Sequence, residues 1–190
     1  MTGITIDIEI PAAEIRERLG RIIDRLDQPL SLYRDIGQHM IDSTRENFRK
    51  ESSPEGVPWA KLRPSTLRGR KRQKLSLEGI LRARGTLINS INVRATAEGV
   101  TIGSPAEYAA IHQLGGEIER QARSQTIYRK QRKDGSFEPK FRKRKLKTSV
   151  PREVAVGAHS IRIPARPYIG VSSDDQVAIA EIARKWILGE

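Results

Sequence analysis

The sequence predicts an α+β fold in which several helices pack with a small antiparallel sheet. Two observations carry this prediction. Apolar residues recur every three or four positions near the N-terminus and again at the C-terminus, which is typical of amphipathic helices. Between these regions lie short segments bounded by glycine and proline, which are typical of strands and hairpins. We expect one domain over residues 1–190, because that length lies within the range of single domains.

The N-terminal part is expected to contain one strand and two helices. Apolar and polar residues alternate over residues 4–10, which predicts a half-buried strand. Residues 12–26 and 31–50 each carry an apolar stripe with helical spacing, so we expect two helices, broken at Pro29, that pack on each other. The stripe residues are Ile15, Leu19, Ile22, Ile23 and Leu26 in the first helix, and Leu32, Ile36, Met40, Thr44 and Phe48 in the second.

A loop and an interrupted helical region are expected next. Residues 52–63 contain two serines, two prolines and a glycine, with Trp59 and Leu62 as apolar anchors. The basic residues that follow are coarsely helical. Gly79 and Gly85 argue against one continuous helix through them.

Five further elements are expected in the rest of the chain, each from a local signal. Glycine in a tight turn indicates a hairpin, proline favours the first turn of a helix, glycine commonly follows a helix end, and each proline disfavours helix in the residue before it. The elements are a hairpin of residues 91–95 and 100–103 turning at Glu98-Gly99, a helix over 106–114 between Pro105 and Gly115-Gly116, a strand at 160–163, an extended segment at 164–170, and a helix at about 175–188 with Val177, Ile179, Ile182, Trp186 and Ile187 on its apolar side. Asp174 and Asp175 are expected to cap the last helix.

Positive charge is concentrated in two segments. The formal net charge is +12, from 35 Lys and Arg against 23 Asp and Glu. Residues 61–84 hold nine basic residues and one acid, and residues 120–147 hold twelve and two. Such segments suit nucleic acid or an acidic protein face, because binding a polyanion releases counterions. The alternative is a solvated arm that keeps the protein soluble.

The second basic segment is expected to form an inserted β-arm or loop over residues 117–150, because Asp134-Gly135 is a strong hairpin signal. Its charges are interleaved with Tyr128, Phe137 and Phe141, which could stack or anchor. The residues predicted to contact DNA or an acidic partner are Arg129, Lys130, Arg132, Lys133, Arg142, Lys143, Arg144 and Lys145. The sequence has no zinc finger, zipper or other DNA-reading motif, so we expect no base-specific recognition.

The sequence holds no catalytic or metal-binding motif. Cysteine is absent, which excludes disulfides and thiolate metal sites. The three histidines, His39, His112 and His159, lack the spacing of a helical metal pair, and no zinc-protease, hydrolase or phosphate-loop pattern occurs. We expect no enzyme activity, metal or cofactor. A metal-dependent nuclease and a triad assembled in space around His112 are the enzyme alternatives.

The sequence also bears on where the chain resides. No apolar run approaches the roughly 20 residues of a membrane span. The N-terminus lacks the basic start and apolar block of a signal peptide. We therefore expect a soluble protein that is cytoplasmic when made.

Three stretches of the sequence combine into one pattern. They are Phe48 with Pro54-Glu55-Gly56-x-Pro58-Trp59-x-x-Leu62; Ile80-Leu81 and Gly85-x-Leu87-x-x-Ser90-Ile91 leading to Val100-x-Ile102-Gly103-Ser104; and Tyr108-Ala109-x-Ile111-His112-Gln113-Leu114-Gly115-Gly116 followed by Ile163-Pro164-Ala165-Arg166-Pro167-Tyr168-Ile169-Gly170. Their order and spacing resemble the phage virion morphogenesis family, which includes tail-completion proteins of contractile-tailed phages. The resemblance covers residues 36–188, and the combination of the last two motifs is its most specific part.

The resemblance implies a structural protein at the head–tail junction, acting in tail completion or head–tail joining as a ring and not as an enzyme. It implies the neck-protein fold, which is α+β. The expected partners are further copies of the chain, the head–tail connector, tail terminator or tail tube proteins, and packaged DNA, but no membrane. The expected location is the neck of the virion, after assembly in the host cytoplasm. A nucleic-acid-binding protein that uses its basic arms is the alternative.

The motif residues are also candidates for contact with another subunit. Tyr108 and His112 share one face of the short helix, and two adjacent glycines allow close backbone approach. Pro164 and Pro167 keep their segment from fully joining a sheet, so it suits an edge or an exposed contact. The predicted contact residues are Trp59, Tyr108, His112, Gly115, Gly116, Arg166 and Tyr168. The alternative is that both motifs only define turns and core.

Overall fold

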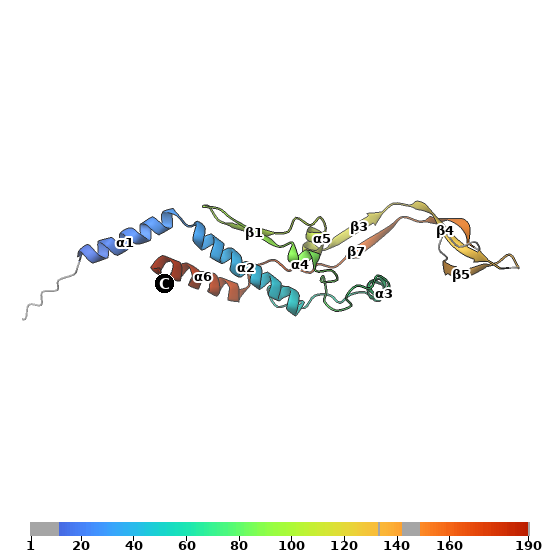
Figure 1. Cartoon of the computed structure of the whole chain (residues 1–190), viewed down its shortest axis with the longest axis horizontal. Coiled ribbons are helices and arrows are strands. Elements are labelled where there is room, and N and C mark those ends of the chain that lie inside the picture. The colour runs from blue at the N-terminus through green and yellow to red at the C-terminus, as the bar shows by residue number, and fades with distance from the viewer. Residues whose placement is uncertain (1–11, 133, 142–148, 190) are drawn as a thin grey trace, which may run out of the picture. The chain divides into compact units, whose positions relative to one another are not determined.

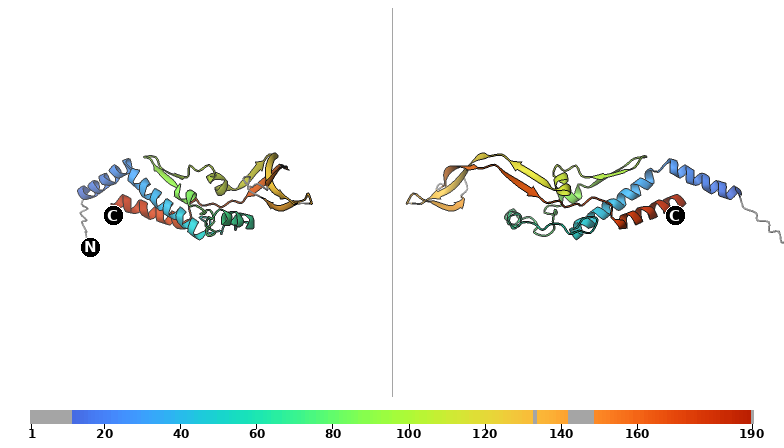
Figure 2. Two further views of the ribbon diagram at one scale, coloured as in Figure 1. Left: turned by 45° about the vertical axis from the view of Figure 1, so that its right-hand side comes forward. Right: turned by 180° about the vertical axis from the view of Figure 1, so that it is seen from behind.

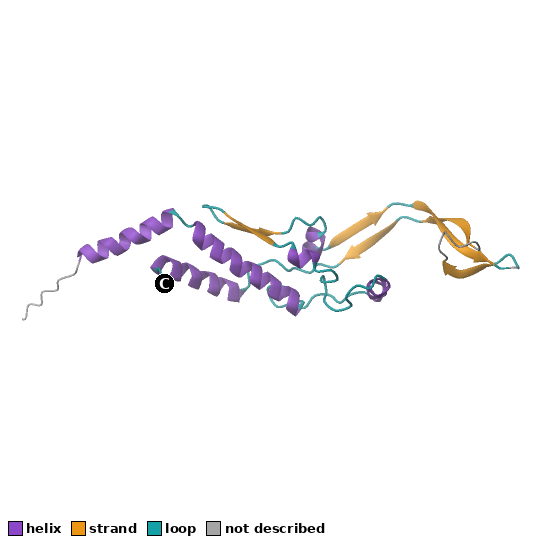
Figure 3. Cartoon of the chain, in the orientation of Figure 1, coloured by secondary structure: helices purple, strands orange, loops and turns teal. Residues whose placement is uncertain are grey.

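The computed structural model describes residues 12–132, 134–141 and 149–189 (Figure 1). Within them lie the helices α1 (Ala12–Asp27), α2 (Leu30–Lys50), α3 (Pro64–Arg72), α4 (Thr86–Asn89), α5 (Ala109–Leu114) and α6 (Ser173–Leu188), and the strands β1 (Asn92–Ala95), β2 (Val100–Gly103), β3 (Gly116–Arg120), β4 (Arg123–Gln131), β5 (Phe137–Phe141), β6 (Ser149–Val156) and β7 (His159–Ile163). The strands pair antiparallel (Figure 3), which confirms the α+β class. The strand predicted at residues 4–10 lies outside the described residues.

The chain divides into two compact units. The first unit contains the described residues up to Leu114 and those from Ala165 onward, and so holds all six described helices and the β1-β2 hairpin. The second unit is Gly115–Pro164 and holds β3 to β7. The single-domain organisation and the basic arm over residues 117–150 stay predictions.

Helix α2 is the central element of the first unit. It packs beside α6 and against the β1-β2 hairpin (Figure 2). The hairpin predicted over residues 91–103 is confirmed, and its register places Val93 opposite Ile102. At Gly37 of α2, an added Cβ would overlap the side chain of Val93, so the absence of a side chain there allows the helix to approach the hairpin closely.

The core of the first unit is small and aromatic. The ring centroid of Phe48 lies 5.6 Å from that of Trp59, at an interplanar angle of 86°, and 5.1 Å from that of Tyr168. Such edge and tilted arrangements suit aromatic quadrupoles. The predicted apolar stripe of α2 is confirmed where it enters this unit, because Met40, Thr44 and Phe48 are buried. Around them the core cluster includes Ile80, Leu87, Ile91 and Ala109.

Helix α1 forms where predicted, but its predicted packing on α2 is wrong. None of its residues is buried, and four apolar side chains of its stripe are 45–59% exposed. The C-terminal end of α1 instead meets α6, where Arg25 Nη1 donates to the carbonyl oxygen of Ile187 over 2.8 Å. A periodic stripe indicates that a helix has an apolar face but not which surface covers it. The exposed residues are Ile15, Leu19, Ile23 and Leu26.

Two other helix predictions need correction. Helix α5 begins at Ala109 and not at residue 106, because the preceding residues form a turn in which the Ala106 N–H donates to the Ser104 hydroxyl. In α6, Val177 is 71% exposed and does not belong to the apolar side. At 3.6 residues per turn it lies about 160° around the helix from Ile179.

The second unit consists of two antiparallel sheets. β3 pairs with β7, which contains the strand predicted at 160–163, and β4 lies between β5 and β6. The turn predicted at Asp134-Gly135 is confirmed, since Gly135 has a φ of 81° and Arg132 N donates to Ser136 O over 2.7 Å. Asp134 Oδ1 accepts from the hydroxyl of Ser136 and stabilises the turn.

Candidate functional site: the family motifs

One amide side chain joins the two most specific motifs. The side chain of Gln113, at the end of α5, lies against the extended segment 164–170. Its Oε1 accepts the backbone N–H groups of Tyr168 and Ile169 over 3.0 and 3.2 Å, and its Nε2 donates to Ile169 O over 2.7 Å. These backbone groups have no strand partner, so Gln113 supplies the hydrogen bonds that a neighbouring strand would otherwise provide. Gln113 was not among the site residues predicted from the sequence, although it lies inside the motif.

Tyr168 holds the same segment from the inside. Its side chain is 1% exposed, its hydroxyl donates to Ala109 O over 3.1 Å, and its own carbonyl accepts from Asn47 Nδ2 over 3.1 Å. Burial, with a smaller contribution from nearby Tyr108, raises the pKa of the Tyr168 hydroxyl. The hydroxyl therefore stays protonated and able to donate near neutral pH.

Arg166 and Trp59 bind the segment to the loop at residues 52–63. Arg166 donates through Nε and Nη2 to Ala60 O over 3.0 and 2.8 Å, while its backbone N–H donates to His112 O. The indole Nε1 of Trp59 donates to Pro167 O over 2.8 Å. Arg166 is thus a buried cation whose charge is satisfied by carbonyl oxygens.

The seven predicted subunit-contact residues divide by exposure. Trp59, Arg166 and Tyr168 are buried within the chain, and their side-chain polar groups are used there. Tyr108 is 42% exposed and lies edge-on to half-buried His112, with ring centroids 5.9 Å apart. Gly115 and Gly116, in the second unit, have φ values of 73° and 151°. Subunit contact through this set stays a prediction, and Tyr108 and Gly116 are its exposed members.

His112 does not assemble the triad considered above. Burial, and then the positive charge of Arg166, lower the pKa of His112, so the ring is neutral near pH 7. Its Nδ1 atom is buried without a hydrogen-bond partner in the described part of the chain. A serine nucleophile needs hydrogen bonds on both sides of the imidazole, and the described residues provide none to His112.

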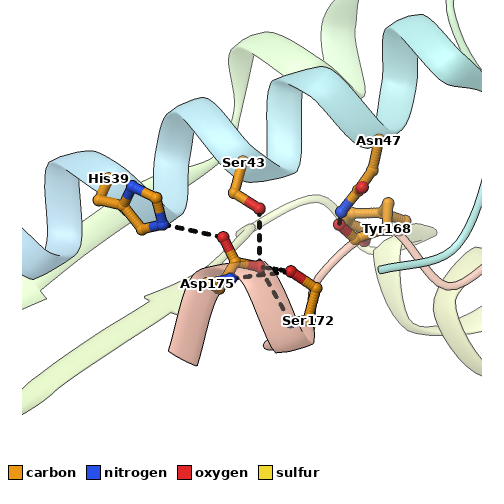
Figure 4. Close-up of polar contacts among 6 residues, drawn as sticks. All are labelled: His39, Ser43, Asn47, Tyr168, Ser172 and Asp175. Atoms are coloured by element: carbon orange, nitrogen blue, oxygen red, sulfur yellow. Dashed lines mark hydrogen bonds and ion pairs between the residues drawn. The ribbon is translucent and has the colours of Figure 1, made fainter. Parts of the chain in front are cut away.

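A second polar cluster surrounds Asp175 and joins α2 to the start of α6 (Figure 4). Asp175 Oδ2 accepts from the hydroxyls of Ser43 and Ser172 over 3.0 and 2.7 Å. Asp175 Oδ1 lies 2.9 Å from His39 Nε2. Ser172 and Asp175 also form a reciprocal capping box, which confirms the predicted capping role of Asp175.

This cluster contains serine, histidine and aspartate but not in the order of a catalytic triad. In a triad the histidine lies between the other two and removes the serine proton. Here both Ser43 and His39 bond to Asp175, and the serine proton points to the carboxylate. Burial alone would raise the pKa of Asp175, but hydrogen bonds from Ser172, Ser43 and His39 lower it overall. The arrangement keeps a carboxylate charged and fastens α6 to α2.

The motifs that converge in the first unit are those of one family. Residues 10–188 match the phage virion morphogenesis family. The chain belongs to the phage virion morphogenesis family. It is also 25% identical over 188 residues to the protein described as "Putative capsid assembly protein G" of Escherichia phage Mu, which covers 97% of this chain and 96% of that protein. No solved structure matches the chain.

As a member of the phage virion morphogenesis family, the chain has a role in building a phage particle. The described residues contain no group of three or more His, Asp or Glu side chains placed to hold a metal ion. None of the helices described is long and apolar enough to cross a membrane.

Three of the eight residues predicted to contact DNA or an acidic partner lie within the described part of this family member. Arg129 lies over the ring of Phe141, 5.2 Å from its centroid, and Lys130 Nζ lies 3.6 Å from Glu138 Oε1. Arg132 is exposed beside the hairpin turn. Phe141 and Phe137, two of the aromatic residues between these charges, therefore contact cations of the chain itself, since Arg152 lies 5.3 Å from the centroid of the Phe137 ring. Lys133, Arg142, Lys143, Arg144 and Lys145 lie outside the described residues, and DNA or partner contact through the set stays a prediction.

Proposed function

We propose that the chain is a structural protein of the head–tail junction that acts in tail completion or head–tail joining and assembles non-covalently into a ring. The family membership and the relative described as a capsid assembly protein support a role in joining parts of the particle. Its action is binding and not catalysis.

The exposed apolar stripe of α1 is the observation that carries the assembly proposal. Four large apolar side chains on one helix remain 45–59% exposed, and no residue of that helix is buried. Burying their exposed halves against another surface would contribute roughly 3–6 kcal/mol. A 16-residue helix is also only marginally stable without packing. We infer that α1 docks on a neighbouring copy, and a head-to-tail contact of this kind closes into a ring when its rotation permits.

The motif network supports the proposal from inside the subunit. Gln113, Trp59 and Arg166 fix an irregular segment through side-chain bonds to backbone groups. A segment held in this way keeps one conformation, so the subunit pays no cost for ordering it when it assembles. This gives a physical reason for placing irregular backbone in an assembly protein.

The proposal is tested by imaging particles from a producer strain that lacks the protein. DNA-filled heads beside unattached or abnormally ended tails are the expected result. Normal infectious particles would overturn the proposal and favour the nucleic-acid-binding alternative.

A second experiment tests whether the apolar stripe of α1 is needed for assembly. Complementation with the double variant Leu19→Gln and Ile23→Gln should fail to restore joined particles, and the purified variant should sediment as a smaller species than wild type. The matched control is Arg18→Gln on the same helix, an exposed residue whose charge faces Glu14. The control should assemble normally. Equal assembly by both variants would contradict docking through α1.

A further inference from the structure

The stretch at residues 61–74 gathers exposed cations that have no acidic partner within the described residues. This stretch contains seven Lys and Arg residues and no acid. Six of them are exposed, and the described part of the chain gives none of the six an ion pair or a side-chain hydrogen bond. They are Lys61, Arg63, Arg68, Lys71, Arg72 and Lys74.

The longer helices show the opposite arrangement. Cations on α1, α2 and α6 commonly lie one turn from an acidic residue and pair with it. The pairs include Arg18 with Glu14, Arg21 with Glu17, Arg45 with Asp42, Arg49 with Glu46, and Arg184 with Glu181. Each exposed pair adds at most about 1 kcal/mol to stability, but it neutralises charge locally. The six exposed cations of residues 61–74 instead present unpaired charge to solvent.

The backbone that carries these charges is fixed. Arg70, the seventh basic residue, is buried, and its Nη1 donates to Gly79 O over 2.9 Å and to Ser76 O over 3.3 Å. Glu51, just after α2, accepts the Ile80 N–H over 2.7 Å. Helix α3 is thereby tied to the loop that follows it, and that loop to the end of α2. The exposed cations project from a set position and not from a disordered tail.

The spacing of the charges suits a row of phosphates. Arg68, Lys71 and Arg72 are related by three and four residues and share one face of α3. Around the helix axis, Arg68 and Arg72 lie about 160° from buried Arg70, and Lys71 lies about 100° from it. A helix of nine residues is about 13.5 Å long, the axial length of about four phosphates of one DNA strand. Leu67, 37% exposed, is the one large apolar residue exposed within 61–74. A protein partner would need an apolar centre to its interface, so the surface favours a phosphate backbone.

We propose that the exposed cations of residues 61–74, centred on α3, form a binding surface for the phosphate backbone of duplex DNA. We call them the α3 basic face. Lys and Arg contacts to phosphate carry no sequence information, so the binding is independent of base sequence. This site differs from the residues of the second basic segment predicted above to contact DNA. The proposal does not depend on the head–tail role, because it concerns the isolated protein and DNA.

The test measures binding of the full chain to a short labelled duplex by fluorescence anisotropy at increasing potassium chloride. In the triple variant R68Q/K71Q/R72Q, the slope of log affinity against log salt should shrink by about 0.9 for each phosphate that is no longer neutralised, and so by about 2.7. Affinity at low salt should fall roughly tenfold or more. The replaced side chains are exposed, so the thermal midpoint should match wild type. An unchanged slope and affinity would overturn the proposal.

The matched control is R45Q/R49Q/R184Q, which removes the same charge from paired cations of α2 and α6. Its slope should stay near that of wild type. Equal losses of affinity in the two triple variants would mean that net charge alone governs binding, and this would overturn the site. A loss confined to R129Q/K130Q/R132Q would overturn it too, because binding would then belong to the second basic segment.

A last experiment tests whether the partner is an acidic protein. Labelled poly-glutamate replaces the duplex at the same salt concentrations. Weaker binding than to the duplex is expected, because a flexible chain of carboxylates must be ordered on binding. Tighter binding to poly-glutamate that disappears in R68Q/K71Q/R72Q would assign the α3 basic face to an acidic protein and overturn DNA as its ligand.

Discussion

The extended segment 164–170 and helix α1 show opposite relations between regular structure and burial. The segment has no regular secondary structure, yet Arg166 and Tyr168 within it are among the most buried residues of the described chain. Helix α1 is regular over 16 residues, yet none of them is buried. Secondary structure and burial are therefore set by different interactions in this protein.

The difference follows from where backbone hydrogen bonds are made. A helix satisfies the N–H and C=O groups of its interior, so α1 can form with its apolar stripe unburied, with a stability that is marginal until the stripe is covered. The extended segment cannot do so, and its backbone groups bond to the side chains of Gln113, Trp59 and Asn47. Tertiary contacts are thus essential to the segment, whereas α1 keeps its apolar face free for a partner.

Replacing Tyr168 should have the largest effect on the stability of the protein, because this residue holds the extended segment from the inside. Tyr168→Ala leaves a cavity beside Phe48 and removes the bond to Ala109 O, so unfolding should become easier by about 3–5 kcal/mol. Chemical denaturation of the full chain measures this. Tyr108→Ala is the control, because that side chain is 42% exposed and should cost far less. Equal destabilisation by the two variants would show that the segment is not held from inside.

Replacing Gln113 should cause the next largest loss of stability. Gln113→Ala leaves two N–H groups and one carbonyl of the segment without partners, and the expected loss of stability is about 2–3 kcal/mol. Gln38→Ala, which removes an exposed amide on α2 bonded to Asp42, should cost less than about 0.5 kcal/mol. Hydrogen exchange at the Tyr168 and Ile169 amides should rise in the first variant alone. Unchanged protection there would refute the strand-like role of Gln113.

Asp175 should make stability depend on pH, with a smaller effect. Its pKa in the folded protein lies below the ordinary value near 3.9. Its contribution is therefore complete above about pH 5 and is lost as pH falls through 3.9 toward the folded pKa. Asp175→Asn should cost about 1–2 kcal/mol at pH 7 and flatten the acid limb of the stability curve. Asp174→Asn, at an exposed neighbour, should preserve that limb. An identical acid limb in wild type and Asp175→Asn would contradict the assignment.

The α1 stripe should have the smallest effect on the isolated subunit. Leu19→Gln with Ile23→Gln should change the free energy of unfolding of the monomer by no more than about 0.5 kcal/mol, because both side chains are exposed. Denaturation at low protein concentration measures this. A destabilisation comparable to that of Tyr168→Ala would mean that α1 packs within the chain. The conclusion that α1 is unburied while the extended segment 164–170 is buried would then be wrong.

Much of the fold could be predicted from local patterns. The stripe of α2 predicted buried Met40, Thr44 and Phe48, and glycine turn signals located the β1-β2 and β4-β5 hairpins. These predictions succeed because periodicity and turn chemistry are properties of neighbouring residues. The placement of α1 failed because the surface that covers an apolar face is a property of the whole molecule.

The polar network of the site was not predictable in the same way. Gln113 and Tyr168 are 55 residues apart in the chain, and Asn47 and Tyr168 are 121 apart. Nothing in the local sequence marks such pairs. Charge counting also misassigned Arg70, which adds to a basic segment in composition but is buried under carbonyl oxygens. An arginine that is satisfied by backbone carbonyls cannot be told from a solvent-exposed one without the fold.

The way the second unit joins the chain bears on how this protein can vary in length. The backbone N–H of Arg166 donates to His112 O, and Gly116 then lies opposite Ile163 in the paired strands β3 and β7. The chain therefore leaves and re-enters the first unit at adjacent points. Because this junction is closed by hydrogen bonds, extra residues inserted within the second unit would add an entropic cost of loop closure that grows only slowly with their number. A change in the length or charge of the second unit would therefore leave the aromatic core of the first unit unaltered.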